Sequence, residues 1–462
     1  MEHHEKFIRM TTYPVERLMG RLAIPTITTM LITAFYNMAD TFFVGQLHNT
    51  SATGAVGVVF SFMAIIQACG FFFGQGSGNA ISRLLGQEKT DEAERLASIG
   101  FFSALLTGGL IMVLGLIFLT PLARLLGSTE TILPYAKDYL RIILFGAPYM
   151  TSSLVLNNQL RFQGNAFYGM LGMGAGAVLN VALDPVFIFV LDMGVSGAAL
   201  ATALSQFVGF CILLFCCTRG DNLRIRFRLF RPRLADYGVI LRGGLPTLCR
   251  QGLSSASTIC LNFMAGTFGG DPAIAAMSIA TRVMHLAFSA VIGFGQGFQP
   301  VCGFNYGAGL YSRVKRAFHF CARVSTVILT AAAIAGAVFA PRLVGLFSDD
   351  PAVIPIGALS LRLMCIGLPF MGWYTSGNMM LQTIGKVGRA SFLSMSRQGI
   401  FFIPIVLGLP LLFKLTRGAV DPLLGVQLAQ PLADVISFIV SVPMTVGVLR
   451  TFGEDTPRTN GE

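Results

Sequence analysis

Charged residues are scarce in this chain. They make up 12% of its 462 residues, whereas a soluble domain usually carries about 25%. Hydrophobic residues make up 54%. Apolar runs of about 20 residues recur, and this length is enough to cross a hydrocarbon core about 30 Å thick. The balance excludes a soluble globular protein and indicates a polytopic membrane protein.

Features of secreted and metal-binding proteins are also missing. The first 16 residues carry polar side chains such as His3, His4 and Glu5 and have no apolar core. We therefore expect no cleavable signal peptide, and insertion directed by the first helix itself. The nine cysteines lie almost wholly inside apolar runs and lack metal-ligand spacing, which argues against a disulfide framework and against a metal site.

The apolar runs predict an all-α fold with twelve membrane-spanning helices. Their approximate bounds are 22–44, 54–81, 96–119, 132–156, 166–190, 195–217, 237–264, 275–304, 318–340, 353–378, 390–413 and 423–449.

The chain repeats itself at a fixed offset of 221 residues. Gly74-Gln75-Gly76 returns as Gly295-Gln296-Gly297, and Gly164 returns as Gly385. Such an offset indicates a duplicated unit of six helices. Because six is even, the two copies are expected to be parallel repeats. The predicted parts are a cytoplasmic segment (1–21), an N-terminal six-helix bundle (22–217), a basic linker loop (218–236), a C-terminal six-helix bundle (237–449) and a cytoplasmic polar tail (450–462).

The net charge of +11 is placed unevenly along the chain. Basic residues gather before the first helix, in the 218–236 loop and around 313–316, and the intervening loops hold few. This alternation is the positive-inside pattern, so we expect a multi-pass protein of the inner (plasma) membrane with both termini in the cytoplasm. It favours anionic membrane lipids over nucleic acid as the partner of the arginine-rich loop.

Two acidic residues lie inside predicted spans of the first copy. Asp40 falls on Leu261 of the second copy, and Asp184 falls on Ile405. An acid in a membrane-spanning helix is costly and is by default a functional candidate. The alternative is a structural acid that a helix end or an interfacial water satisfies.

Each of these acids has polar neighbours. Tyr36 precedes Asp40 by four residues, and Asn180 precedes Asp184 by four, so each pair shares a helix face. Pro185 removes a backbone donor directly after Asp184. Two carboxylates close together in low dielectric cannot both ionise cheaply, so such a pair is suited to taking up and releasing a proton.

Glycines recur every fourth residue on two predicted helices. Gly70, Gly74 and Gly78 share one face of the second span, and Gly172 and Gly176 share one of the fifth. The Gly74–Gly78 segment lacks the lysine and hydroxyl residue of a phosphate loop. Its spacing favours close approach of two membrane helices instead.

Proline and arginine residues inside the spans leave alternatives open. Pro25 and its equivalent Pro246 could be prolines tolerated at a helix start, or points at which the helix bends. Arg282 and Arg397 lie inside spans of the second copy, where an arginine lines a cavity or binds protein groups rather than lipid.

Four segments are specific when they are taken together: Ala39–Gly45, Gly74–Gly76, Leu179–Pro185 and Gly194–Ala203. With them the chain resembles the multidrug and toxic compound extrusion (MATE) family, in its DinF-like, multidrug export protein branch with an acid pair in the N-terminal bundle. The resemblance covers nearly the whole chain. It implies two bundles in a V around a central cavity that opens alternately to either side.

The activity implied by the resemblance is antiport. The family exports amphipathic, often cationic drugs or toxic metabolites in exchange for protons or sodium, without a cofactor and without catalytic residues. Residues matching the coupling site of this branch are Tyr36, Asp40, Asn180, Asp184 and Thr202. Protons are the expected ion, and sodium at Asp40, Asn180, Asp184 and Thr202 is the alternative.

Expectations for the substrate cavity are less specific. The 39 phenylalanines and 20 methionines predict adaptable apolar contacts with drugs. The candidate cavity residues are Asn157, Met173, Arg282, Arg397 and Gln398. We expect a monomer.

Three other functions are compatible with a polytopic membrane protein. A lipid-linked or polysaccharide flippase would need a strongly basic cavity, at which Arg282 and Arg397 hint. An intramembrane enzyme would need clustered ligands, and Asp349-Asp350 is the only pair of adjacent aspartates. A channel would need a ring of filter carbonyls or charges, and no segment resembles one.

The loop charges give a testable topology. A tag inserted within 218–236 should be labelled only after the cells are permeabilised, because the arginines hold this loop in the cytoplasm. Labelling of that tag in intact cells would overturn the assignment, and a tag near Arg342 in an opposite loop serves as the accessible control.

Overall fold

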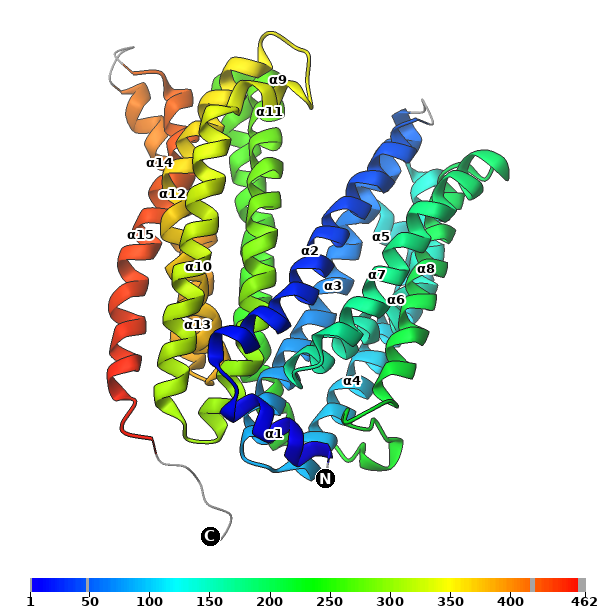
Figure 1. Ribbon diagram of the computed structural model, residues 1–462. Helices are drawn as coiled ribbons and strands as arrows, with labels where there is room; N and C mark the ends of the chain where they lie inside the picture. The colour runs from blue at the N-terminus through cyan, green and yellow to red at the C-terminus, as the bar shows by residue number, and fades with distance from the viewer. Residues whose placement is uncertain (1, 47–49, 416–419, 456–462) are drawn as a thin grey trace. The chain divides into compact units, whose positions relative to one another are not determined.

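The computed structural model describes residues 2–46, 50–415 and 420–455, and these residues are almost entirely helical (Figure 1). Contacts divide the chain into two compact units. Unit 1 comprises residues up to 13 and 21–244, and unit 2 comprises 14–20 and the residues from 245 onward.

The helices of unit 1 come first in the chain. They are α1 (Glu2–Thr12), most of α2 (Val15–Gly45), α3 (Thr50–Gly86), α4 (Thr90–Ile117), α5 (Leu119–Leu125), α6 (Leu133–Phe162), α7 (Ala166–Pro185), the π-helix η1 (Val186–Val190), α8 (Gly194–Cys217) and the short 3₁₀-helix η2 (Phe227–Leu229).

Unit 2 follows the same succession of long helices. They are the greater part of α9 (Leu234–Gly307), then α10 (Tyr311–Val338), α11 (Ala340–Gly345), α12 (Val353–Thr383), α13 (Val387–Met395), the π-helix η3 (Ser396–Ile400), α14 (Phe402–Lys414) and α15 (Pro422–Thr451).

Helix α9 contains two spans rather than one. It runs for 74 residues, but Gly270 within it has non-helical angles of φ 65° and ψ −162°. Only glycine adopts such a conformation without strain. Leu261 and Met264 before the break and Ala273 and Met277 after it belong to one buried cluster, so the two halves fold back together. Eleven described helices are long and apolar enough to cross a membrane, and counting α9 twice gives the twelve predicted crossings.

Helix α2 begins earlier than the apolar run predicts. The predicted span starts at residue 22, whereas the helix starts at Val15, because polar residues at a membrane surface can continue a helix. Pro25 therefore lies inside α2, and a tolerated proline in the first turn is ruled out. The hydroxyl of Thr29 donates to the Pro25 carbonyl at 2.8 Å. Bonds of this kind compete with the helix ladder and often accompany bends.

The glycine face on α3 packs tightly against α6, as its spacing predicts. Gly70, Gly74 and Gly78 leave no space for a side chain. An added Cβ would lie 2.8, 2.9 and 2.2 Å from the side chains of Leu154, Asn158 and Phe162, respectively. These distances are shorter than real Cβ contacts, so the close approach of the two helices depends on glycine.

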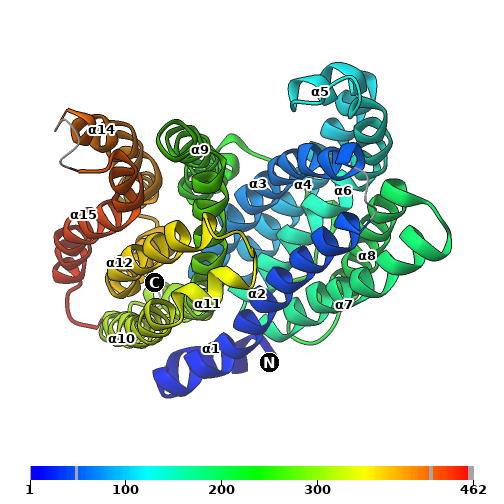
Figure 2. The ribbon, with the colours of Figure 1, turned by 90° about the horizontal axis from the view of Figure 1, so that it is seen from above.

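Helices α7 and α8 pack in the same manner and run side by side in both views (Figures 1 and 2). An added Cβ at Gly172 would lie 2.4 Å from Leu213, and one at Gly176 would lie 3.1 Å from the Ser205 carbonyl. This contact brings the polar residues of the two helices together.

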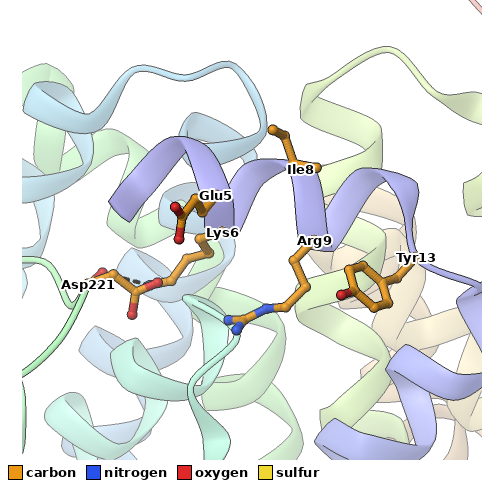
Figure 3. Close-up of a pocket in the computed structure, with 6 residues that line it drawn as sticks. All are labelled: Glu5, Lys6, Ile8, Arg9, Tyr13 and Asp221. Carbon is orange, nitrogen blue, oxygen red and sulfur yellow. Dashed lines mark hydrogen bonds and ion pairs between the residues drawn. The ribbon is translucent and has the colours of Figure 1, made fainter. Parts of the chain in front are cut away.

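Lys6 holds helix α1 against the segment that follows α8, where Asp221 lies (Figure 3). The Lys6 side chain is only 2% exposed and forms an ion pair with the Asp221 carboxylate at 3.2 Å. Its Nζ also donates to the Asp221 carbonyl at 2.7 Å. Burial lowers the pKa of Lys6 to about 8. Although burial opposes it, the Lys6 ammonium and the Asn165 amide lower the pKa of Asp221.

The packing of α3 on α6 gives a matched test. Gly78→Ala should lower the stability of the purified protein by about 1–3 kcal/mol, the usual cost of overpacking, because its Cβ would meet Phe162. Gly109 on α4 has no atom within 4 Å of an added Cβ. Gly109→Ala should therefore be neutral or stabilise the helix by up to about 1 kcal/mol. Thermal unfolding in detergent measures both, and equal melting temperatures would contradict the packing argument.

Candidate functional site

Three of the predicted coupling residues meet where α7 packs on α8. Asn180 and Asp184 lie one turn apart near the end of α7, and Thr202 lies on α8. The Asn180 amide Nδ2 donates to Asp184 Oδ1 and to Thr202 Oγ1, at 3.4 Å in each case. The side-chain amide therefore bridges the carboxylate and the hydroxyl of two helices.

This cluster is buried, and the two hydrogen bonds that the Asn180 amide donates within it are long. Asp184, Asn180 and Thr202 are 0%, 2% and 3% exposed. Typical N–H···O hydrogen bonds measure about 2.9–3.0 Å, so both contacts are long. Among the residues that the structure describes, none donates to the buried Oδ1 of Asn180. Buried polar atoms are normally satisfied, and an atom left in this state is suited to binding a small ligand.

A π-helical turn follows the cluster directly. The N–H of Leu191 bonds to the carbonyl of Val186 at 2.9 Å, the i→i+5 pattern of η1. Pro185, which closes α7, has no N–H to continue the α-helical ladder. Single π-helical turns occur frequently at functional sites, and this one begins two residues after Asp184.

The other two predicted coupling residues lie on α2. Tyr36 is half-buried there. The backbone of Asp40 continues the same helix, but its side chain lies outside the part of the chain that the structure describes. The pairing of Asp40 with Asp184 stays a prediction.

The predicted cavity residues come from both units. Asn157 on α6 is half-buried, and its Oδ1 would lie 2.5 Å from a Cβ at Gly169. Met173 packs against the apolar cluster that α4, α6 and α8 form. Arg282 is exposed on α9. In unit 2, the backbone carbonyl of the half-buried Gln398 accepts a hydrogen bond from Ser257 Oγ.

Arg397 has a partner that the sequence analysis did not single out. Its Nε donates to Asp434 Oδ1 on α15 at 2.7 Å. The same oxygen accepts a hydrogen bond from Gln430 Nε2, also at 2.7 Å. Asp434 is thus a buried acid of the second copy. A search of every span for acidic residues, rather than only positions equivalent to Asp40 and Asp184, would have found it.

The acid pair considered for an enzyme has a local role. Asp350 Oδ1 accepts a hydrogen bond from the Ala352 N–H at 2.8 Å in an exposed turn. That bond orders the turn before α12.

Comparison with known proteins agrees with this architecture. A family model described as MatE matches residues 25–186 and again 246–407, two segments displaced by the same 221 positions as the repeats. The multidrug export protein MepA of Staphylococcus haemolyticus (strain JCSC1435) is 28% identical over 404 residues, which are 87% of this chain and 88% of that protein.

Solved structures show the same fold. An outward-facing multidrug resistance MATE family transporter of the MOP superfamily superposes with a TM-score of 0.89 at 26% identity, over 96% of this chain and 98% of that one. MATE in a bent conformation gives 0.88 at 27% identity, with the same coverage of both chains. The family resemblance and the all-α class predicted from the sequence are confirmed. This multi-pass membrane protein belongs to the MatE family, the multidrug and toxic compound extrusion transporters.

Proposed function

We propose that the chain is a secondary active multidrug exporter, which exchanges protons for amphipathic, often cationic drugs or toxic metabolites by alternating access. Its family and the multidrug export protein MepA to which it is similar support export. The observation that carries the coupling is Asp184, a carboxylate fully buried in a membrane-spanning bundle beside Asn180 and Thr202.

The geometry of this cluster supports an exchangeable cation. An ionised carboxylate in a membrane interior is costly unless a charge or several donors compensate it. The Asn180 side-chain amide donates to Asp184 Oδ1 at 3.4 Å, which is long for a hydrogen bond. Protonation removes the charge, and a sodium ion could use the carboxylate, the Asn180 Oδ1 and the Thr202 hydroxyl. A proton needs only the carboxylate, so we favour proton coupling.

The remaining assignments extend this proposal. Drug contacts would involve Asn157, Met173, Arg282 and Gln398 together with nearby aromatic residues. The exporter would work as a monomer in contact with anionic lipids, with both termini in the cytoplasm.

A flippase is the weaker alternative. Binding a pyrophosphate requires uncompensated positive charge, whereas Arg397 is paired with Asp434 at 2.7 Å. The intramembrane enzyme is excluded, because the chain belongs to a family of transporters.

Coupling through the two acids can be tested directly. In inverted vesicles, a proton gradient alone should drive drug transport, and Asp184→Asn or Asp40→Asn should reduce it to the background rate, because an amide cannot exchange a proton. Ile405→Asn changes the position equivalent to Asp184 in the second copy and should retain transport. Expression is compared by immunoblot. If only a sodium gradient drives transport, the coupling ion is sodium and not the proton. If either acid variant transports at the wild-type rate, that acid takes no part in coupling.

The role of Pro25 as a bending point can be tested separately. A change of charge at Asp40 alters the hydrogen bonds that the side chains of α2 require. Pro25, with the threonines after it, provides a point at which the helix can bend in response. Pro25→Ala should slow transport about tenfold, equivalent to about 1.4 kcal/mol, while drug affinity measured by fluorescence polarisation stays nearly unchanged. Parallel loss of binding and transport, or of neither, would identify a purely structural proline.

A further inference from the structure

Unit 2 contains a buried ion pair in a membrane-spanning bundle. Arg397 Nε lies 2.7 Å from Asp434 Oδ1, and the two side chains are 18% and 3% exposed. Gln430 donates to the same carboxylate oxygen at 2.7 Å. The guanidinium of Arg397 also lies over the ring of Phe288, 4.6 Å from its centroid. The ion pair is therefore short. Asp434 accepts a second hydrogen bond from Gln430, and Arg397 is also held by the ring of Phe288.

The surroundings of Asp434 leave little room for anything else. A Cβ at Gly367 of α12 would lie 2.9 Å from the Asp434 side chain, so α12 closes that side. Tyr374, also on α12, lies within electrostatic reach of both members of the pair. Two titratable side chains of α9 also face this group of residues. His285 interacts electrostatically with Arg397, and Arg250 interacts with Tyr374.

The two bundles thus solve one problem in different ways. A carboxylate inside a bilayer needs a compensating cation or a proton. At Asp184 the hydrogen bond from Asn180 is long, 3.4 Å. At Asp434 a guanidinium provides a charge-assisted hydrogen bond of 2.7 Å, the length typical of such bonds. Arginine stays charged at any physiological pH, so this compensation is permanent.

We infer that Asp434 is a second monovalent-cation site whose occupant is built into the chain, the guanidinium of Arg397 filling the place that an exchangeable cation takes at Asp184. This inference rests on the proposed coupling role of Asp184. It means that the second bundle holds its cation throughout the transport cycle. The number of cations exchanged for each drug is then set by the first bundle alone.

The local backbone supports this assignment. Arg397 is the second residue of the π-helix η3, in which the Phe401 N–H bonds to the Ser396 carbonyl at 2.9 Å. A π-helical turn holds one residue more than an α-helical turn, and so changes the direction of the side chains on it. The corresponding helix of unit 1 has its π-helical turn, η1, directly after Asp184. Each bundle therefore has a π-helical turn beside its buried carboxylate.

Removal of the tethered cation should open the site. Arg397→Gln leaves Asp434 without its charge partner and should make it bind a free cation. Binding of radioactive sodium to the purified protein detects a sodium ion. An infrared carbonyl band of a protonated carboxyl group detects a proton. The matched control is the double variant Arg397→Gln, Asp434→Asn. The single and double variants differ only at Asp434, so a difference in cation binding between them belongs to this acid and to no other. Arg397→Lys retains a cation and should behave as the wild type.

A further variant separates the loss of the ion pair from unfolding of the protein. Arg397→His retains a positive charge at acidic pH and loses it as the pH rises, so cation binding at Asp434 should appear on raising the pH. Size-exclusion chromatography follows the fold at each pH.

The expected result is one additional sodium ion or proton for each chain in Arg397→Gln and in neutral Arg397→His, and none in the double variant. Folded variants that gain neither would overturn the inference. Unfolding of Arg397→His on neutralisation would also overturn it, because the pair would then be purely structural. These readouts measure binding at Asp434, so they stand apart from the transport assay of Asp184.

Discussion

Every ionisable group in the interior of this protein is subject to one constraint: hydrocarbon does not solvate charge. A carboxylate there must be neutralised or surrounded by donors. Asp184 accepts a hydrogen bond of 3.4 Å from the Asn180 amide, whereas Asp434 accepts hydrogen bonds of 2.7 Å from a guanidinium and an amide. The donor–acceptor distances differ by 0.7 Å, so the hydrogen bond that holds Asp434 to Arg397 is much stronger than the one that Asn180 donates to Asp184.

The helix packing follows from the same solvent. Apolar side chains gain little by leaving lipid for a protein interior, so tight association relies on close backbone approach. Gly172 and Gly176 bring α7 onto α8, and this contact places Thr202 of α8 beside Asn180 of α7. The small residues and the polar cluster are therefore parts of one arrangement: without the first, the amide could not bridge the two helices.

Sequence patterns predicted the features of the fold that depend on the spacing of residues along a single helix. The number of spans, the glycine face of α3 and the shared face of Asn180 and Asp184 all follow from helical periodicity and hydropathy. The place of Thr202 came only from the family resemblance, because no periodicity relates it to α7. The extension of α2 to Val15 was missed, since hydropathy marks the hydrocarbon core and not the end of a helix.

The ion pair in unit 2 was missed for a different reason. Arg397 and Asp434 are 37 residues apart on separate helices, and their pairing depends on tertiary contacts. The repeat offset drew attention to positions equivalent to Asp40 and Asp184, whereas the second copy places its acid on another helix. The π-helical turn that carries Arg397 also lacks the proline that marks the one after Asp184.

Helix α1 has a consequence for chemical labelling. With a pKa of about 8, Lys6 is about one quarter unprotonated near pH 7.5, against about 0.1% for an ordinary lysine. The docked amine is thus nucleophilic but shielded, and a released amine would be accessible but protonated. Acylation should be slow in both states at neutral pH, for opposite reasons. Raising the pH accelerates the released form far more than the docked form, whose amine is already partly unprotonated, so the pH dependence of the acylation rate of this one lysine would report how often α1 leaves its site.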